Sequence, residues 1–563
     1  MKTLTAALAA LVLATGAPAS VARAEDAVFS DIRLRGSYLA DMSYAVPRSE
    51  APDLYTNPIL PGFYPDPSIT RVGDDYYLIN STFAFYPGIP IFHSRDLVNW
   101  TQIGNAIDRP GMLDFKGLGT SRGVFAPDIS YHDGVFYIVN TCVDCGGNFL
   151  ITATDPAGPW SDPVWLPVDG IDPSLFHDDD GTTYLINNGP PEGTPLYDGH
   201  RAIWIQAFDR KTQKLTGPRQ LIVNGGTDLS QKPSWIEGPH IFKHDGHYFL
   251  IAAEGGTGDH HSEVVFRADT VFGPYVPWTG NPILTQRDLD PNRPNPITSA
   301  GHADLVQTAG GDWWAVFLAT RPYGPDLYNT GRETFLLPVK WRDGYPVILD
   351  RNTPIPQQAQ RPAGLTQAPP ANPWYQDIHG YDPLTWLSIR GPSSDFLTVS
   401  PDHKTLTLAA RPDALGDVTQ RPSFVGLRQQ NNTTALGTFV TFNPGEGDRA
   451  GLAAVQSDNA YAFCGVTRRN GVTEVILTRR AGPSDPSDGV ILAEQPVDAS
   501  HGIHLTLDIL RGRLRCMYVE DKNYMKADFV HLGGDSDATF LSTQKAGGFV
   551  GTILGLYAYG KAH

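Results

Sequence analysis

The sequence predicts an all-β protein: a five-bladed β-propeller followed by an antiparallel β-sandwich. Three observations lead to this fold class. One unit of about 45 to 65 residues recurs five times, a stretch rich in proline and glutamine follows, and the rest of the chain reads as alternating strands separated by tight turns. The 57 glycines and 47 prolines supply the turns that many short strands need.

The composition excludes several other classes of protein. Of the 563 residues, 41% are hydrophobic and only 18% are charged, which rules out a disordered chain or a coiled coil. The formal net charge of −17 opposes binding to nucleic acid and to anionic membranes. We therefore expect a neutral or cationic partner, and neither a nucleic acid nor a membrane.

The first 24 residues read as an export signal. Lys2 supplies the positive start, residues 4–13 an apolar run that is too short to span a bilayer, and Ala22-Arg23-Ala24 a small-x-small cleavage site. We expect residues 1–24 to be a signal peptide and the mature protein to be periplasmic or secreted.

The repeated unit centres on a turn that is followed by an aromatic-rich strand. Its five copies are residues 74–79, 133–138, 180–185, 245–250 and 311–316. Because Asp-Gly before a β-rich run is a hairpin signal, Asp133, Asp180 and Asp245 are turn residues rather than catalytic candidates. Units of this size with three or four strands are propeller blades. We assign residues 25–352 to the propeller, including an N-terminal extension to about residue 54.

A short strand with a polar residue near its start precedes each of these turns. In a propeller the first strand of every blade lines the central axis, so the five strand starts converge at one end of the channel. They bring together one residue from each copy of the unit: Asp66, Asp128, Asp172, Glu237 and His302.

The carboxylates of this group carry the predicted chemistry. Like charges around one funnel raise the pKa of at least one group, and a protonated carboxylic acid beside an ionised one can cleave a glycosidic bond. The longer reach of Glu237 suits protonation of the leaving oxygen, with Asp66 as the base acting on water, or else a nucleophile. An aspartate before proline is also a common turn residue. For Asp128 and His302 a purely structural role stays as open as a site role.

A loop of the fourth blade lies near Glu237 in the sequence. Thr257 and His261 belong to it and could line the subsite for the leaving group. The pair His260-His261 is a poor zinc site, because adjacent residues of a strand point apart.

After the propeller the character of the chain changes. Residues 353–373 contain six Pro and four Gln, as a semi-rigid linker does. Residues 374–563 contain alternating strands such as residues 503–510, with turns such as Asn470-Gly471, and we expect them to form the sandwich.

The chain contains four cysteines. Cys142 and Cys145 are close enough in sequence for a local disulfide, and two packed thiols are an equal alternative. Cys464 and Cys516 are isolated, so a four-cysteine zinc site is not indicated.

A series of motifs resembles glycoside hydrolase family 43, and its β-xylosidase branch in particular. The motifs keep their order along the propeller: residues 57–68, 81–83, 125–127, 171–176, 236–240, 300–303 and 331–334. Residues 424–430 and 441–444 are similar to the accessory sandwich of that branch.

The resemblance implies a role for several residues. It makes Asp66 the general base and Glu237 the general acid of an inverting enzyme, and Asp172 the acid that tunes the pKa of Glu237. Three substrate contacts follow from it: Arg332 grips sugar hydroxyls, and Phe83 and Phe125 form an apolar wall. Asp128 matches none of the three catalytic positions, and we keep it as a substrate-binding candidate.

The resemblance also bears on metal. His302 matches a histidine that in some relatives helps to hold calcium, or a water bound to it, in the channel. Calcium prefers oxygen ligands, so one histidine is weak evidence for an ion. We expect chemistry without a cofactor, and treat calcium in the channel as a site to be tested.

The expected activity is release of terminal xylose from β-1,4-xylo-oligosaccharides with inversion, with the two carboxyl groups roughly 6.5–9.5 Å apart. An α-L-arabinofuranosidase, or an enzyme with both activities on arabinose-decorated oligosaccharides, is the nearest alternative. A retaining fructosidase would carry Glu-Cys and Arg-Asp-Pro motifs, whereas here Gly238 follows Glu237. A sugar-binding propeller without activity would need no acid–base pair. Oligomeric state stays open.

Overall fold

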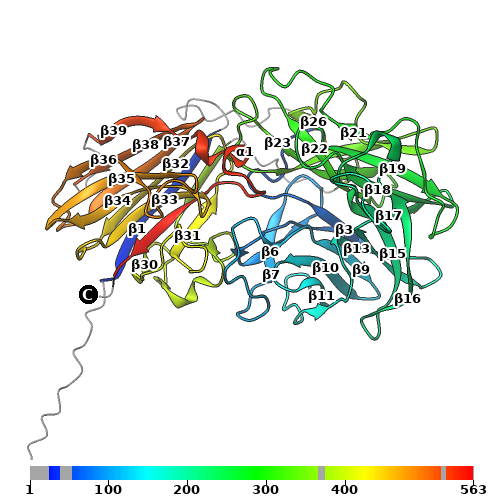
Figure 1. Ribbon diagram of the computed structural model, residues 1–563, viewed down its shortest axis with the longest axis horizontal. Coiled ribbons are helices and arrows are strands. Elements are labelled where there is room, and N and C mark those ends of the chain that lie inside the picture. Colours follow the sequence, from blue (N-terminus) through cyan, green and yellow to red (C-terminus); the bar gives the residue numbers. More distant parts are fainter. Residues whose placement is uncertain (1–24, 38–52, 366–374, 521–527, 562–563) are drawn as a thin grey trace, which may run out of the picture.

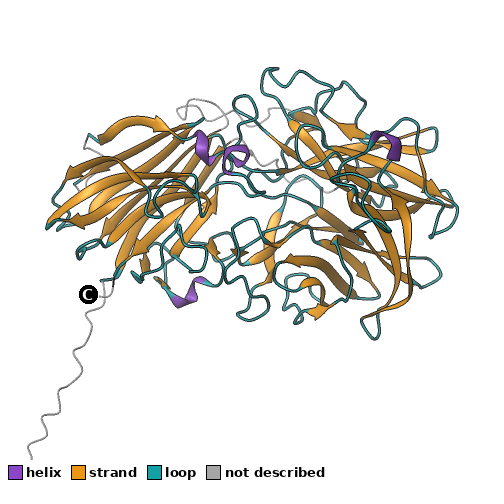
Figure 2. Cartoon of the chain, viewed as in Figure 1, coloured by secondary structure: helices purple, strands orange, loops and turns teal. Residues whose placement is uncertain are grey.

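The computed structural model describes residues 25–37, 53–365, 375–520 and 528–561. These residues form two bodies built almost entirely of strands, lying side by side (Figures 1 and 2). The propeller is the cyan and green body of Figure 1, and the sandwich is the yellow to red one. The predicted fold class is confirmed. The predicted signal peptide, residues 1–24, lies outside the described residues.

Each blade of the propeller is a four-stranded antiparallel sheet, with a short extra strand in two of them. The strands are β3 (Ser68–Val72), β4 (Asp75–Ile79), β6 (Gly88–Ser94) and β7 (Thr101–Ile107) in blade one; β9 (Asp128–His132), β10 (Val135–Val143), β11 (Gly147–Ala153), β12 (Val164–Trp165) and β8 (Gly123–Val124) in blade two; β13 (Ile171–His177), β14 (Thr183–Gly189), β15 (Ala202–Asp209) and β16 (Lys214–Asn224) in blade three; β17 (Glu237–His244), β18 (His247–Glu254), β19 (Ser262–Ala268), β20 (Val276–Pro277) and β21 (Leu284–Thr285) in blade four; and β22 (Thr298–Gln307), β23 (Trp313–Thr320), β24 (Glu333–Arg342) and β25 (Tyr345–Val347) in blade five.

The hairpins between the first two strands of a blade follow the predicted turn chemistry. Asp133 and Gly134 have φ values of 50° and 83°, and Asp245 and Gly246 have 47° and 80°. Two successive residues with positive φ are what a two-residue type I′ hairpin requires. These aspartates therefore serve the turns, and their side chains stand away from the axis.

The propeller ring is closed by the segment that precedes blade one. β2 (Leu54–Thr56) pairs with β26 (Gln358–Gln360), and the side chain of Asn57 exchanges two hydrogen bonds of 3.0 Å with the backbone of Leu336 in blade five. Part of the predicted linker, residues 353–365, is thus packed on the propeller. Its remainder lies outside the described residues.

The second body consists of two packed antiparallel sheets. One contains β29 (Leu397–Val399), β30 (Leu406–Leu408), β1 (Ala27–Ser37), β27 (Tyr375–His379), β32 (Thr433–Thr441), β37 (Ile503–Leu510), β38 (Arg513–Val519) and β39 (Val530–Asp537). The other contains β36 (Val490–Pro496), β35 (Val472–Ala481), β34 (Ala460–Arg469), β33 (Arg449–Ser457), β40 (Ile553–Tyr559), β31 (Ser423–Arg428), β28 (Leu387–Ile389) and β5 (Phe85–Tyr86). The short helices are Leu229–Gln231, Ser393–Asp395, Thr539–Leu541 and α1 (Thr543–Ala546).

Two strands cross from the expected propeller region into the sandwich. β5, from blade one, pairs with β28, and β1 lies between β30 and β32, where its blue ribbon is visible in Figure 1. The prediction that residues 25–54 extend the propeller is therefore wrong for Ala27–Ser37. The physical reason is burial: despite an irregularity between Ser30 and Arg33, the strand places Phe29, Ile32 and Leu34 in the core between the two sheets.

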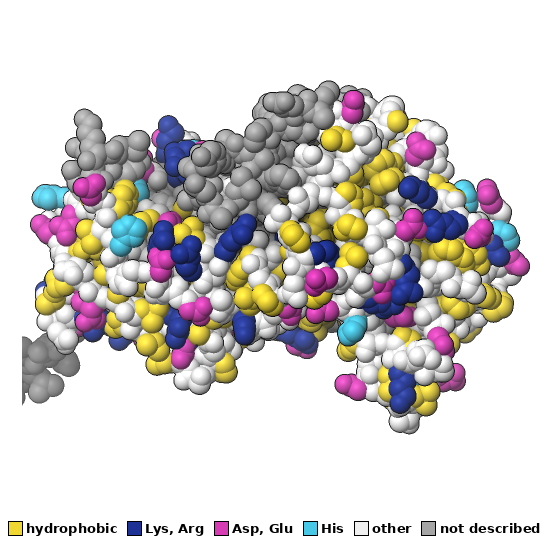
Figure 3. All heavy atoms as spheres, turned by 90° about the horizontal axis from the view of Figure 1, so that it is seen from above, with side chains coloured by type: hydrophobic (Ala, Val, Ile, Leu, Met, Phe, Trp, Pro, Cys, Tyr) yellow, Lys and Arg dark blue, Asp and Glu magenta, His cyan; other side chains and the backbone are white. Residues whose placement is uncertain are grey.

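The surface carries charged side chains of both signs, as the composition leads one to expect (Figure 3). Acidic and basic side chains are interspersed with scattered hydrophobic ones in the view from above (Figure 3). Among the described residues, no helix has the length and apolar character needed to cross a membrane.

All four cysteines are paired. Cys142 is joined to Cys145 at the end of β10, which settles the alternative left open by the sequence in favour of a local disulfide. Cys464 on β34 is joined to Cys516 on β38, so this second disulfide links the two sheets of the sandwich. This pair is not apparent in the sequence, because 52 residues separate its members.

The disulfide between the sheets should stabilise the sandwich more than the local one does. A cross-link that closes a long loop removes more conformational entropy from the unfolded chain. We expect the double variant Cys464→Ala/Cys516→Ala to lower the free energy of unfolding by about 2–4 kcal/mol. The variant Cys142→Ala/Cys145→Ala serves as the matched control with a smaller loss in urea denaturation. Equal losses would contradict this account.

Candidate active site

A pocket of about 430 Å³ opens at one end of the propeller axis. Most of its lining comes from the strand starts and loops of the blades, and one residue, Phe549, comes from the sandwich. The lining residues are Asp66, Phe83, Arg122, Phe125, Ala126, Ile171, Asp172, Trp235, Glu237, Gly256, Thr257, His302, Arg332 and Phe549. The structure therefore brings together four of the five strand-start residues, all except Asp128.

The inner strands place their residues in two layers along the axis. The upper layer, at the pocket, holds Asp66, Asp172 and His302, all with positive φ (51°, 52° and 54°). The ladders are irregular where Asp172, Gly238 and His302 lie, and such bulges re-aim side chains. Two residues further along each strand, the side chains belong to a lower layer.

Asp66 is held by an ion pair and a hydroxyl. Its Oδ1 accepts a hydrogen bond of 2.8 Å from Nη1 of Arg332, and its Oδ2 accepts one of 2.5 Å from Oγ of Ser81. The same Arg332 nitrogen donates to Oγ1 of Thr257 at 3.2 Å. Buried charges persist only when they are paired in this way, so this carboxylate has a defined orientation at the pocket floor.

Glu237 is a carboxyl group of the pocket whose proton affinity is raised. Burial, followed by the negative charge of Asp172, raises the pKa of Glu237 to about 8. The positive charge of His302 acts in the opposite direction and is outweighed. Glu237 is therefore protonated near neutral pH, as a proton donor must be.

Asp172 connects the acid to the neighbouring blades. Its Oδ2 accepts a hydrogen bond of 3.2 Å from the backbone N–H of Gly238 and lies 3.6 Å from Nε2 of His302. Burial alone would lower the pKa of His302, but the contact with Asp172 and the charges of Asp66 and Glu237 raise it to about 9. A Cβ at Gly238 would lie 2.7 Å from the ring of His302, so glycine permits this close approach.

Three aromatic rings form an apolar wall beside the carboxylates. The ring centroids of Phe83 and Phe125 are 5.2 Å apart, and each lies 5.8 Å from that of Phe549. The Arg332 guanidinium lies 5.5 Å from the Phe549 ring centroid. Phe83 and Phe125 thus occupy the predicted place, and Phe549 completes the wall from the other domain.

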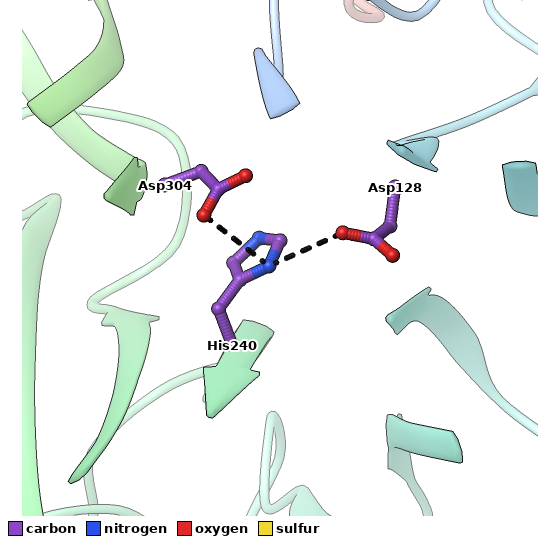
Figure 4. Close-up of side chains that lie close together, drawn as sticks. All are labelled: Asp128, His240 and Asp304. Atoms are coloured by element: carbon purple, nitrogen blue, oxygen red, sulfur yellow. Dashed lines mark ion pairs between the residues drawn. The ribbon is translucent and has the colours of Figure 1, made fainter. Parts of the chain in front are cut away.

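Asp128 does not line the pocket. It belongs to the lower layer, where its Oδ1 lies 3.5 Å from Nδ1 of His240, which is 3.7 Å from Oδ1 of Asp304 (Figure 4). Asp128 also accepts hydrogen bonds from Oγ of Ser68 and the N–H of Leu175. The prediction that Asp128 contacts substrate is wrong, because in the motif Ala126-Pro127-Asp128 it is Ala126 that takes the upper position.

His240 acts as a buried cation between two carboxylates. Burial alone would lower its pKa, but the charges of Asp304 and Asp128 raise it to about 9. The pair of aspartates and the histidine come from the inner strands of blades two, four and five. They therefore tie three blades together below the pocket.

Asp128, His240 and Asp304 have the side-chain types of a metal site, but their chemistry does not suit calcium. Among the described residues this trio is the one group of three whose potential ligand atoms lie within 4.8 Å of one another. Calcium takes about six to eight oxygen ligands, whereas the trio offers two carboxylates, with at most four oxygens, and an imidazole that pairs with both of them. The residues do not fit calcium. His302, the predicted metal ligand, is outside the trio and faces Asp172.

The two candidates from the blade-four loop have different outcomes. Thr257 lines the pocket and receives a hydrogen bond from Arg332. His261 is wrong as a substrate contact: it is fully buried below the pocket, and its Nδ1 is 2.9 Å from the backbone oxygen of Ser299. Burial lowers the pKa of His261 to about 3, so it is a neutral packing residue.

Sequence reasoning missed three residues of the lining that carry large side chains: Arg122, Trp235 and Phe549. Phe549 follows Gly547-Gly548, a loop signal that marks it in retrospect. Its N–H donates to Oγ of Ser121, a bond of 2.9 Å between the two domains. Arg122 and Trp235 adjoin recognised motifs but carry no signal of their own.

A five-bladed propeller whose axial pocket combines a protonated glutamic acid, a second carboxylate paired with arginine and an aromatic wall defines a glycosidase. The chain belongs to glycosyl hydrolases family 43, whose family model matches residues 55–346. A second model, the beta xylosidase C-terminal concanavalin A-like domain, matches residues 381–563. The resemblance seen in the motifs is confirmed over both domains.

Similar proteins cover almost the whole chain. A xylosidase/arabinosidase of Butyrivibrio fibrisolvens is 36% identical over 515 residues, 89% of this chain and 95% of that protein. A non-reducing end alpha-L-arabinofuranosidase of Bacteroides ovatus is 33% identical over 94% of both chains. The crystal structure of a GH43_12 protein retrieved from a capybara gut metagenome has a TM-score of 0.85 and 38% identity, covering 95% of this chain and 99% of that chain.

The lower layer should contribute to stability in a pH-dependent way. His240 has a folded pKa raised above its ordinary value, so its stabilising contribution is complete below about pH 6.5 and is lost as pH rises through about 9. We expect His240→Leu, which leaves two unpaired carboxylates, to lower the free energy of unfolding at pH 6 by about 3–5 kcal/mol.

The difference in the free energy of unfolding between His240→Leu and the wild type, measured by urea denaturation, should become smaller at higher pH. His244→Leu, at the far end of the same strand, is the matched control. Its difference in the free energy of unfolding from the wild type should not shrink in this way as pH rises. A difference for His240→Leu that does not depend on pH would contradict the cationic role.

Proposed function

We propose that this protein is an inverting, exo-acting β-xylosidase that releases terminal xylose from β-1,4-xylo-oligosaccharides. The observation that carries the proposal is Glu237, whose pKa is raised to about 8 in a pocket that also holds the arginine-paired Asp66. The match to the beta xylosidase C-terminal domain and the name of the Butyrivibrio relative support xylose as the sugar.

The two carboxyl groups divide the reaction between them. Asp66, oriented by Ser81 and Arg332, takes a proton from a water molecule that attacks the anomeric carbon. Glu237 gives its proton to the oxygen of the leaving sugar as the glycosidic bond breaks. Both proton transfers use side chains of the protein, and we propose that the chemistry needs no metal ion.

The aromatic wall on one side of the pocket supports exo action. Phe549 stands at the wall formed by Phe83 and Phe125, so an apolar barrier limits the pocket on that side. A pocket with one closed end accommodates the end of a sugar chain rather than its middle. Arg332 is placed to donate hydrogen bonds to the hydroxyls of the terminal sugar.

We also propose that the protein is exported, to the periplasm or the medium, after removal of residues 1–24. The signal-like start of the sequence supports this, and so do the two disulfides, since disulfides persist in oxidising compartments.

The proposed function is tested by comparing rates on an aryl β-xyloside, an aryl α-arabinofuranoside and xylobiose, with the anomer of the product followed by NMR. We expect a higher kcat/KM on the xyloside and α-xylose as the first product. Glu237→Gln should slow hydrolysis of xylobiose by about 10²–10⁴-fold.

This test can contradict the stereochemistry, the sugar preference, the enzymatic activity and the role of Glu237 independently of one another. β-Xylose as the first product would mean retention, a faster arabinofuranoside would reverse the sugar preference, and binding without turnover would make the protein a sugar-binding module. A nearly unchanged rate for Glu237→Gln would remove that residue from the role of acid.

The pH dependence tests the role of Asp172. Activity requires protonated Glu237, so kcat/KM should fall as pH rises through about 8. Because the charge of Asp172 raises the pKa of Glu237, Asp172→Asn should move this alkaline limb to lower pH. Asp178→Asn, directly after the far end of the same strand, is the control and should leave the limb in place. If the alkaline limb of the kcat/KM profile stays at the same pH in Asp172→Asn, then Asp172 does not raise the pKa of Glu237.

A further inference from the structure

Trp235 is an aromatic residue at the rim of the pocket that the mechanism does not use. It lines the pocket, yet its relative exposure is 41%, one of the highest values for a large hydrophobic residue among the described ones. It precedes the proposed acid Glu237 by two residues. Single exposed hydrophobic side chains are common on protein surfaces, so the observation that points to a binding role is the place of Trp235 in the pocket lining.

The backbone of Trp235 is held in an unfavourable conformation. Its φ is 51°, a left-handed value that is unfavourable for a residue with a bulky side chain and persists only where the surroundings enforce it. The N–H of Trp235 donates to the backbone oxygen of Gly199 at 2.9 Å, and the oxygen of Ser234 accepts from the N–H of Gly255 at 2.8 Å. Loops from two blades thus clamp this residue.

The indole ring is supported from one side. The guanidinium of Arg201 lies 5.1 Å from its ring centroid, a cation–π contact. Arg201 donates to Oδ1 of Asn188 at 2.6 and 3.0 Å, while Nδ2 of Asn188 donates to the backbone oxygen of Ile236 at 2.5 Å. One asparagine therefore fixes both the supporting arginine and the chain next to Trp235, and the remaining ring surface is presented to solvent and the pocket.

A close approach of backbone completes the arrangement. A Cβ on Gly199 would lie 3.0 Å from Oγ of Ser234 and 3.4 Å from Cδ1 of Trp235. The φ of Gly199 is 80°, which also favours glycine. The ring is thus rigid before any ligand binds, and a rigid platform loses little entropy on binding.

We propose that Trp235 forms the platform of the subsite for the leaving sugar, with the apolar C–H face of that pyranose stacked on its indole ring. This inference rests on the proposed function. Glu237 must reach the glycosidic oxygen, so the leaving sugar lies on the side of Glu237, where Trp235 stands. Phe83, Phe125 and Phe549 occupy the wall that encloses the terminal sugar instead.

The test compares xylobiose with methyl β-xyloside. Both have poor leaving groups that need protonation by Glu237, but only xylobiose places a sugar ring beyond the scissile bond. A displaced acid would therefore slow both substrates alike, whereas a lost platform slows xylobiose alone. We expect Trp235→Ala to lower the ratio of kcat/KM for xylobiose to that for methyl β-xyloside about tenfold, and Trp235→Phe to restore part of it.

Trp165→Ala is the matched control. Trp165 has a similar exposure of 45%, lies on β12 at the outer edge of blade two, and does not line the pocket, so the ratio should stay at the wild-type value. A Trp235→Ala enzyme that is active with an unchanged ratio, or equally slowed on both substrates, overturns the platform. A wild-type protein inactive on both xylosides overturns the proposed function and, with it, this inference.

Discussion

Buried charge on the propeller axis is the constraint around which the inner strands are arranged. Five strands that meet at one axis leave little room for water, and a carboxylate without water must find a cation or take up a proton. Asp66 lies against Arg332, Asp172 against His302, and His240 between two aspartates of the lower layer. Among the contacts of the described residues Glu237 has no such direct ion pair, and burial together with the charge of Asp172 raises its pKa to about 8, so it keeps its proton near neutral pH.

The upper layer of the inner strands supplies pocket residues, and the lower layer supplies residues that join the blades. Alternate residues of each inner strand point to different levels, so one repeated motif supplies both a pocket residue and a residue that joins blades. In blade three, Asp172 faces the pocket while Oγ of Ser174 donates to the backbone oxygen of Pro239 in blade four. We therefore expect a substitution in the lower layer to change the spacing of the blades that carry the pocket residues.

The sequence predicts the local part of this arrangement. The Asp-Gly turns, the five blades and the carboxylates Asp66, Asp172 and Glu237 follow from repeats and short-range turn chemistry. The sequence does not show that Asp128 lies in the lower layer. A position two residues further along the strand changes the layer, but the short Pro-containing motif around it looks the same. β1, the Cys464–Cys516 pair and Phe549 depend on contacts between distant parts of the chain, and periodicity carries no information about those.

The sandwich is part of the active site rather than an appended module. Gly331 and Gly551 approach so closely that a Cβ on Gly331 would lie 2.9 Å from Cα of Gly551, and the N–H of Thr552 donates to the oxygen of Asn329 at 2.8 Å. These contacts flank Arg332 on one side and Phe549 on the other. The docking of the two domains thus positions Arg332 and the Phe549 ring together, and a propeller without its sandwich would lack the Phe549 side of the pocket.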